Sequence, residues 1–264
     1  MMEDAMTFAP PPRSEKPRTA GITAMIDFGP DEMGWTGQNG LRDLMACAAP
    51  FIDFAKVYAL NAIVMPEDAV KANVAIYRDN DVTPYTGGVL FEYAYLKEQI
   101  DDMLDHVERL GVPALEISEN YVTFETDQRH EYIARATQRG FQVIWEFGRK
   151  NPEAPFDLDE VGGMIQGAMD AGAHHVILEQ SELDVLEEVS PDEFARLSDQ
   201  SWFPHALIEG DPYRFPEQHG EIIKQFGSEV NLANIAAGQC YRLEGLRRGI
   251  GRAVDYAMFR EYGL

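Results

Sequence analysis

The sequence predicts a single (β/α)₈ barrel, and three observations support this prediction. The chain has 264 residues, close to the ~250 residues typical of that fold. Eight short apolar runs alternate with stretches whose apolar residues recur three or four positions apart, the pattern of strands alternating with helices in a parallel sheet. No Gly-x-Gly-x-x-Gly motif follows the first run, which argues against an open dinucleotide-binding sheet. Eight such units favour a closed barrel.

Each predicted element has its own signal in the sequence. Residues 92–111, 130–140 and 159–172 are helical patterns that end on glycine, a common C-cap. Ser190 and Pro191 mark a helix start as N-cap and first helical residue. Residues 1–15 contain three consecutive prolines and no apolar periodicity, so we expect a flexible N-terminal tail followed by one barrel domain over residues 16–264. The predicted strands cover residues 22–28, 51–59, 82–88, 114–118, 143–148, 176–180, 206–210 and 230–235.

The composition excludes several classes of partner. The chain has 45 acidic against 22 basic residues and a formal net charge of −23. Such a surface repels nucleic acids and anionic membranes, so we expect neither as a partner. No apolar run approaches the ~20 residues of a membrane span. The first residues lack the basic-then-apolar order of a signal peptide. The two cysteines, Cys47 and Cys240, form no Cys-x-x-Cys pair, so we expect reduced thiols and a cytoplasmic protein.

Acidic residues follow most of the apolar runs, and this is the main indication of function. Buried strands rarely carry carboxylates, because an unpaired buried charge is costly. A carboxylate that recurs at the same end of successive strands therefore predicts a functional face, which in a (β/α)₈ barrel is formed by the carboxyl ends of the strands. The acidic residues concerned are Asp27, Asp53, Glu116, Glu146, Glu179 and Glu209.

Eight strings in the chain, taken in order, resemble the phosphosulfolactate synthase family. The resemblance runs from residue 16 to the last helix, and the VNLANIA string is nearly uninterrupted. It implies a carbon–sulfur lyase that adds sulfite to phosphoenolpyruvate with Mg²⁺, giving 2-phospho-3-sulfolactate, on the route to coenzyme M or sulfolactate. It also implies a homo-oligomer. The strings are KPR (16–18), IDFAK (52–56), GGVLFEYAY (87–95), EIS (116–118), EFGRK (146–150), VILEQSE (176–182), FGSEVNLANIA (226–236) and LEGLRRG (243–249).

The resemblance also suggests roles for particular residues. We predict Mg²⁺ ligation by Asp27, Glu116 and Glu146, since Mg²⁺ prefers oxygen ligands. Lys150 matches the family position proposed as general acid, and a neighbouring cation would lower its pKa toward neutrality. Lys56 and Glu182 complete the predicted catalytic group. The predicted contacts with a small anionic or carboxylic-acid substrate are Arg149, Gly87, Gly88, Ser118, Asn231, Asn234 and Arg247.

Each of these residues also has a purely structural interpretation. The carboxylates are then ion-paired or hydrated groups at the rim, and the lysine and arginine are solvated loop residues. Gly87 and Gly88 form a tight turn in that interpretation, and the asparagines make loop and capping hydrogen bonds.

The chain departs from the family pattern mainly where the family carries cations. Phe28 follows Asp27 where the family has lysine, and Val89 replaces a threonine after the glycine pair. Residues 180–184 lack an arginine that the family has there, and the loop after Glu209 is longer than in the family. Arg214 in this loop and Arg252 near the C-terminus could substitute for the missing cations. Residues 57–62 and 250–254 also differ. Two alternatives therefore stay open: metal-dependent addition or enolisation on a less anionic carboxylic acid, and a non-catalytic, stress-associated barrel protein.

Overall fold

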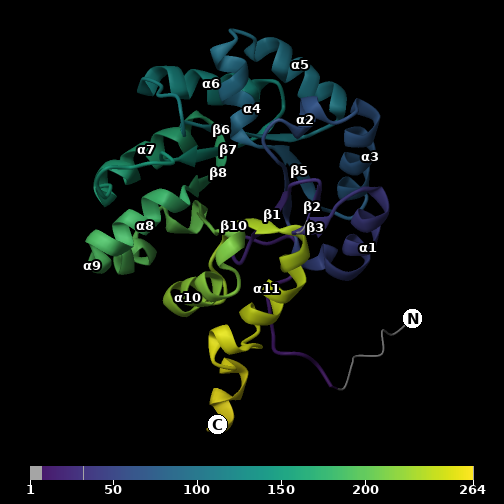
Figure 1. The fold of residues 1–264 in the computed structure, drawn as a ribbon. Coiled ribbons are helices and arrows are strands. Elements are labelled where there is room, and N and C mark those ends of the chain that lie inside the picture. Colours follow the sequence, from purple (N-terminus) through teal and green to yellow (C-terminus); the bar gives the residue numbers. More distant parts are fainter. Residues whose placement is uncertain (1–7, 32, 264) are drawn as a thin grey trace.

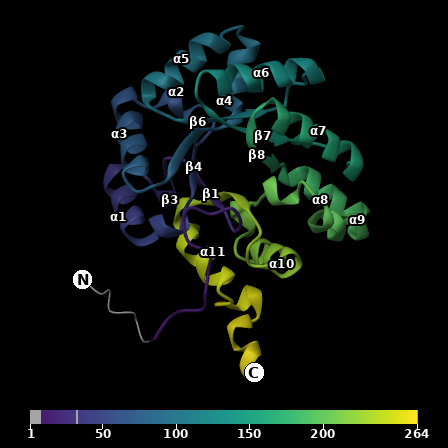
Figure 2. The same ribbon diagram turned by 180° about the vertical axis from the view of Figure 1, so that it is seen from behind.

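A computed structural model describes residues 8–31 and 33–263, and it confirms the predicted barrel. Eight parallel strands close on themselves and helices surround them, as Figure 1 shows. The described N-terminal residues and the C-terminal turns leave the ring of helices on the same side in both views (Figures 1 and 2). The barrel strands are β1 (Thr23–Asp27), β4 (Phe54–Val57), β5 (Thr83–Thr86), β6 (Ala114–Ser118), β7 (Gln142–Phe147), β8 (Ala173–Leu178), β9 (Ala206–Glu209) and β10 (Leu232–Ala236). A short antiparallel hairpin of β2 (Pro30–Asp31) and β3 (Gly34–Trp35) follows β1.

The helices follow the predicted order, with one exception. The pattern over residues 92–111, predicted as one helix, forms the end of one helix and the whole of the next. The chain breaks between them, where Glu98 has a φ of 56° and the N–H of Gln99 bonds back to the carbonyl of Ala94 at 2.9 Å. The helices are α1 (Gln38–Ala48), α2 (Asn61–Val64), α3 (Glu67–Arg78), α4 (Gly88–Leu96), α5 (Ile100–Leu110), α6 (Thr126–Gln138), α7 (Leu158–Ala171), α8 (Gln180–Val189), α9 (Pro191–Ala195), α10 (Glu217–Phe226) and α11 (Cys240–Arg247).

Two apolar layers hold the barrel together, and the alternation of side chains along each strand separates them. Residues such as Met25, Leu115 and Val176 face outward and pack against the helices. Their neighbours face inward and fill the barrel, so it has a packed core and no open channel. The inward-facing set comprises Ile22, Ala24, Phe54, Tyr85, Ala114, Ile144, Ile177, Leu207 and Ala233, and we call it the plug.

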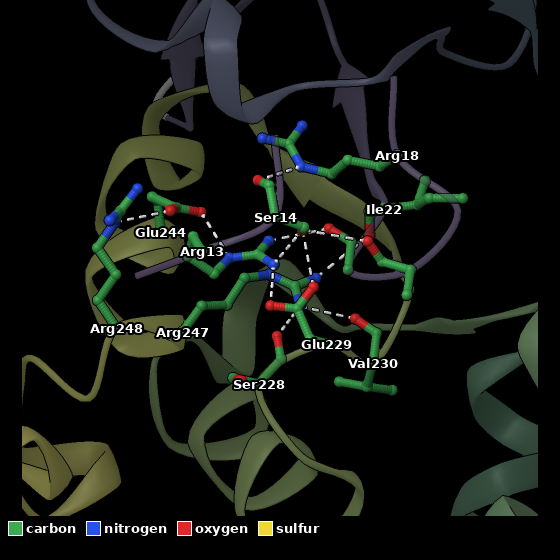
Figure 3. A network of polar contacts seen from close by, with 12 residues as sticks. Arg13, Ser14, Arg18, Ile22, Ser228, Glu229, Val230, Glu244, Arg247 and Arg248 are labelled. Atoms are coloured by element: carbon green, nitrogen blue, oxygen red, sulfur yellow. Dashed lines mark hydrogen bonds and ion pairs between the residues drawn. The ribbon is translucent and has the colours of Figure 1, made fainter. Parts of the chain in front are cut away.

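The segment just before the barrel is fastened to the amino ends of the strands. Arg13, whose side chain is 2% exposed, forms ion pairs with Glu229 at 2.5 Å and with Glu244 at 3.3 Å (Figure 3). Ser14 donates a hydrogen bond to Glu229 at 2.7 Å. The anchored part of the chain therefore includes residues that the sequence assigned to the tail. Residues 1–7 lie outside the described residues, and the flexibility expected of them stays a prediction.

None of the helices in the described part of the chain combines the length and the apolar character needed to cross a bilayer.

His219 on α10 should make stability fall in mild acid. Its ring is fully buried beside Phe215, and burial, together with Arg247 and Arg214, lowers its pKa to about 4. The unfolded chain takes up a proton near pH ~6.5 and the folded chain does not. This contribution to the free energy of unfolding is fully present above about pH 6.5 and is lost as the pH falls toward 4. The loss amounts to about 3 kcal/mol. Urea unfolding of wild type and His219→Leu at both pH values isolates this effect, because a constant repacking offset cancels. Parallel pH curves for the two proteins would contradict it.

Candidate active site at the carboxyl ends of the strands

A layer of charged side chains lies directly above the plug. Glu116, Glu146, Glu179 and Glu209 each come two residues after a plug residue, on or just after four successive strands, β6 to β9. Lys56 comes two residues after the plug residue Phe54 on β4. A spacing of two keeps side chains on one face of a strand, so all five point into the mouth of the barrel. All five are buried.

Three of these glutamates converge on one point. Oxygen atoms of Glu146, Glu179 and Glu209 lie within 4.8 Å of one another. The ammonium of Lys150, from the loop after β7, forms ion pairs with Glu179, with Glu209 at 3.7 Å and with Glu146 at 3.8 Å. Burial alone would lower the pKa of Lys150, but Glu209, Glu146 and Glu179 outweigh burial and raise it. This shift is opposite in sign to the one that a neighbouring cation would produce.

Lys56 links the remaining glutamate to this cluster. Its ammonium lies 2.8 Å from Glu116 and 3.9 Å from Glu146. Burial raises the pKa of Glu116 to about 8, although Lys56 opposes the shift. Burial also disfavours ionisation of Glu146, but Lys56, together with Lys150 and hydrogen bonds with Glu116 and Glu179, outweighs burial and lowers the pKa of Glu146 to about 2. Lys56 thus helps to keep Glu146 ionised.

The charges of the layer do not balance. Four carboxylates, Glu116, Glu146, Glu179 and Glu209, face two ammonium groups, so the formal sum is −4 + 2 = −2. Unpaired charge is costly in a buried site, and either protons or a bound cation would remove it. Burial and the nearby Glu209 raise the pKa of Glu179 to about 10, which is the response to an uncompensated site. The layer therefore has the charge and the oxygen donors to bind a divalent cation.

One glycine of the pair after β5 contacts a carboxyl group, and this group belongs to the chain itself. The N–H of Gly88, at the start of α4, donates to a carboxylate oxygen of Glu116 at 2.6 Å. A Cβ on Gly88 would lie 2.2 Å from the hydroxyl oxygen of Ser118 and 2.9 Å from Glu116. A Cβ on Gly87 would make only ordinary van der Waals contacts, with the stem of Lys56 at 3.4 Å and the backbone nitrogen of Ala59 at 3.5 Å. Gly88 is therefore required for the approach to Glu116, and Gly87 is not.

Gly88→Ala should therefore destabilise the protein, whereas Gly87→Ala should be tolerated. The added methyl group displaces Ser118 and Glu116, and overpacking of this kind costs about 1–3 kcal/mol. Comparing the free energies of unfolding of the two variants in urea separates this clash from a general effect of adding a methyl group at the helix start. Equal stabilities would show that Ser118 can move at no cost.

The structure places Arg149 and Glu182 beside the cluster. The backbone N–H of Arg149 donates to Glu182 at 2.9 Å, while its guanidinium contacts the hydroxyl of Thr123. Glu182 thus supports the loop that carries Lys150. Arg149 is exposed at the rim. Ser118 also lies at the mouth, but its hydroxyl donates to Glu92 of α4.

Of the two predicted asparagines, one lies at the mouth and one does not. Asn234, with a φ of 58°, donates its side-chain amide to Glu209. Asn231 instead accepts from the N–H of Ile22 at 3.0 Å and donates to the carbonyl of Pro204 at 3.0 Å. Those partners lie at the amino ends of the strands, which form the end of the barrel opposite the mouth and are called the closed end below. Asn231 holds this closed end together.

Arg247 also lies at the closed end, contrary to its predicted place beside the substrate. Its guanidinium donates to three carbonyls: Ser228 at 2.5 Å, Val230 at 2.7 Å and Ile22 at 3.2 Å (Figure 3). The side chain is buried among these groups. Arg247 ties β1 to the segment before β10 and has no path to the mouth.

Asp27 points away from the cluster, although it was predicted as a metal ligand. Its carboxylate accepts from the hydroxyl of Tyr77 on α3 at 2.6 Å, from the N–H of Gly29 at 2.9 Å and from the hydroxyl of Thr36. Ile26, its neighbour, is in step with the plug residue Ala24, so Asp27 faces the outer helices. The same test of alternation would have selected Glu179 and Glu209, which the sequence-based prediction left out.

Comparisons with known proteins show the family of this chain. Residues 11–252 match the family model described as (2R)-phospho-3-sulfolactate synthase (ComA). The chain belongs to the phosphosulfolactate synthase family. The resemblance seen in the sequence is thereby confirmed, and family membership indicates an enzyme that acts on small molecules.

Two curated relatives and one solved structure illustrate the relationship. The chain is 33% identical over 258 residues to a phosphosulfolactate synthase of Methanothermobacter thermautotrophicus, covering 94% of this chain and 96% of the relative. It is 34% identical over 240 residues to that of Methanocaldococcus jannaschii, covering 87% and 92%. A crystal structure of 3-hexulose-6-phosphate synthase is similar with a TM-score of 0.50 at 10% identity, covering 87% of this chain and 99% of that chain. This last likeness concerns the fold alone.

Proposed function

We propose that this phosphosulfolactate synthase family member joins sulfite to phosphoenolpyruvate, giving 2-phospho-3-sulfolactate, with Mg²⁺ as cofactor. The observation that carries the proposal is the position of Lys150, whose ammonium lies among Glu146, Glu179 and Glu209 at the barrel mouth. A proton donor and a set of oxygen ligands therefore meet where substrates bind in this fold. The site is buried and its formal charge is negative, which suits binding of a divalent cation, and that cation would offset the charge of an anionic substrate.

The residues present fit a magnesium site. Glu146, Glu179 and Glu209 offer carboxylate oxygens within 4.8 Å of one another, and Mg²⁺ uses one or a few carboxylates while keeping positions for water or substrate. The formal excess of two negative charges in the layer matches a divalent ion. When bound there, the ion would supply positive charge beside the substrate carboxylate as negative charge develops on it. Glu116 is engaged by Lys56 and Gly88 and is left out of the proposed ligand set.

The chain's own residues then account for the remaining chemistry. The sulfur lone pair of sulfite forms a bond to the CH₂ carbon of phosphoenolpyruvate, and the π electrons move toward carbon two and the carboxylate. Lys150 delivers a proton to carbon two and is reprotonated from solvent, since its side chain is 33% exposed. Lys56 helps to keep Glu146 ionised, and Arg149 at the rim contacts the phosphate.

The test is to incubate the purified protein with Mg²⁺, phosphoenolpyruvate and sulfite and to follow loss of the enol absorbance. We expect turnover that requires all three components and stops when a chelator removes the metal. Absence of turnover under these conditions would contradict the proposal. The matched control omits sulfite, which leaves the enol absorbance constant.

One observation favours a second candidate, a metal-dependent addition or enolisation on a less anionic carboxylic acid. Two of the cations that could bind an anion are already paired: Lys56 with Glu116 at 2.8 Å and Arg214 with Asp184 at 2.9 Å. Arg247 lies at the closed end. Stabilisation of the protein against heat by another carboxylic acid, only when Mg²⁺ is present, would support this candidate. If the protein shows no turnover and no such stabilisation, the non-catalytic alternative is favoured.

A further inference from the structure

We infer that Asn120 is a positioning residue for the proposed metal site, and that the buried carboxylate of Glu92 holds it in place. Neither residue belongs to the cluster described above. Together they connect α4, the loop after β6 and the carboxylate of Glu146. The inference rests on the proposed function insofar as Glu146 is assigned there as a metal ligand.

Glu92 organises the loop after β6 through an unusual set of contacts. Its side chain is buried on α4, and within the described residues no lysine or arginine forms an ion pair with it. Four donors surround the carboxylate instead. They are the hydroxyl of Ser118 and the backbone N–H groups of Asn120 at 3.0 Å, Tyr121 at 2.9 Å and Val122 at 3.2 Å. A buried carboxylate that is stabilised by one hydroxyl and three backbone N–H groups fixes the path of that backbone.

Asn120 connects this ordered loop to the glutamate cluster. Its side-chain amide nitrogen donates to a carboxylate oxygen of Glu146 at 3.1 Å and to the carbonyl of Gly148 at 3.0 Å. The first bond orients the carboxylate, and the second fixes the loop that leads to Lys150. Outer-shell partners of this kind set the direction of a ligand's lone pairs and typically contribute 10- to 100-fold to metal affinity.

The same loop is also fixed independently through Glu119, the residue before Asn120. Glu119 accepts from Arg129 and, at 3.2 Å, from the indole N–H of Trp145. Arg129 and Glu119 are both buried. Loss of the Asn120 amide therefore removes the contacts with Glu146 and Gly148 while the loop stays attached to α6 and β7. This is why a substitution at Asn120 can report on positioning without unfolding the loop.

The experiment measures Mn²⁺ binding by calorimetry in wild type, Asn120→Ala, Asn120→Leu and Glu92→Gln, with thermal melts of each. We expect a roughly 10- to 100-fold loss of Mn²⁺ affinity in Asn120→Ala. The loss should be similar in Asn120→Leu, because leucine has about the size of asparagine and lacks the amide that donates to Glu146. Glu92→Gln should change the affinity in the same direction. The control is Asn80→Ala, whose side-chain amide bonds only to the carbonyl of Ile76 at 2.8 Å on the outer helix α3.

The outcomes separate this inference from the proposed reaction. Equal Mn²⁺ affinity in wild type and both Asn120 variants would overturn the positioning role, even if the wild type is active. A wild type that binds Mn²⁺ but does not join sulfite to phosphoenolpyruvate would contradict the proposed reaction and leave the positioning role to be decided by the same binding data. A wild type that binds no Mn²⁺ would overturn the metal site and the positioning role together.

Discussion

Replacing Lys150 by methionine should lower turnover by about 10²- to 10⁴-fold, the usual contribution of a general acid. Methionine keeps most of the length of the side chain and removes the ammonium that contacts Glu146, Glu179 and Glu209. The measurement is the initial rate with saturating substrates. The matched control is Arg149→Met, the next residue, whose guanidinium contacts Thr123 at the rim. We expect that control to raise KM more than it lowers kcat, since it contributes to binding and not to proton transfer.

The same substitution should make the protein bind Mg²⁺ more tightly. The ammonium of Lys150 uses the same carboxylates that are proposed to hold the metal, so lysine and metal ion compete for them. Without the ammonium, the carboxylates lose a counter-charge and gain affinity for a cation. Thermal melts with and without Mg²⁺ should therefore show a larger metal-induced rise in Tm for Lys150→Met than for wild type. An equal or smaller rise would mean that lysine and metal occupy separate places.

The barrel could be predicted from the sequence because each strand is a short apolar run with a clear end. The apolar content of residues 114–118 and 206–210 leaves few alternatives to buried strands, and the structure has strands there. The alternation within each strand also predicts whether a side chain faces into the barrel or toward the outer helices. Glu116, Glu146, Glu179 and Glu209 are in step with the plug and Asp27 is out of step with it. For identifying residues of the site, a position at the end of a strand was thus a weaker criterion than the face of the strand on which the side chain lies.

Other parts of the site could not be predicted, because they depend on how far the chain runs before it turns. Arg247 follows the last strand in sequence, so a place beside a substrate was a reasonable expectation. Helix α11 lies between them, however, and its eight residues span about 12 Å at 1.5 Å per residue. The helix returns toward the amino ends of the strands and leaves Arg247 bonded to Ile22, Ser228 and Val230. Likewise, the contact of Asn120 with Glu146 joins the loop after β6 to strand β7, and it depends on the path that this loop takes.

Glu179→Gln and Glu209→Gln should each abolish tight metal binding, whereas Asp27→Asn should not. Each glutamine removes one carboxylate from the three that lie within 4.8 Å of one another. We expect a loss of Mn²⁺ affinity larger than the roughly 10- to 100-fold that supporting residues contribute, with turnover lost in parallel. Calorimetric titration with Mn²⁺ measures this directly. Because glutamine has the size of glutamate, a change in packing would not explain the result.

Asp27→Asn is the matched control. It should lower the stability of the protein without changing metal binding, whereas the two glutamine substitutions should weaken metal binding. The carboxylate of Asp27 is buried and accepts three hydrogen bonds, from Gly29, Thr36 and Tyr77. An asparagine there places an N–H₂ group opposite one of these donors, at a cost of about 1–3 kcal/mol in the free energy of unfolding. Its Mn²⁺ affinity should stay at the wild-type value. The reverse result, with metal binding lost in Asp27→Asn and kept in both glutamine variants, would move the cation to the outer side of β1 and separate it from Lys150.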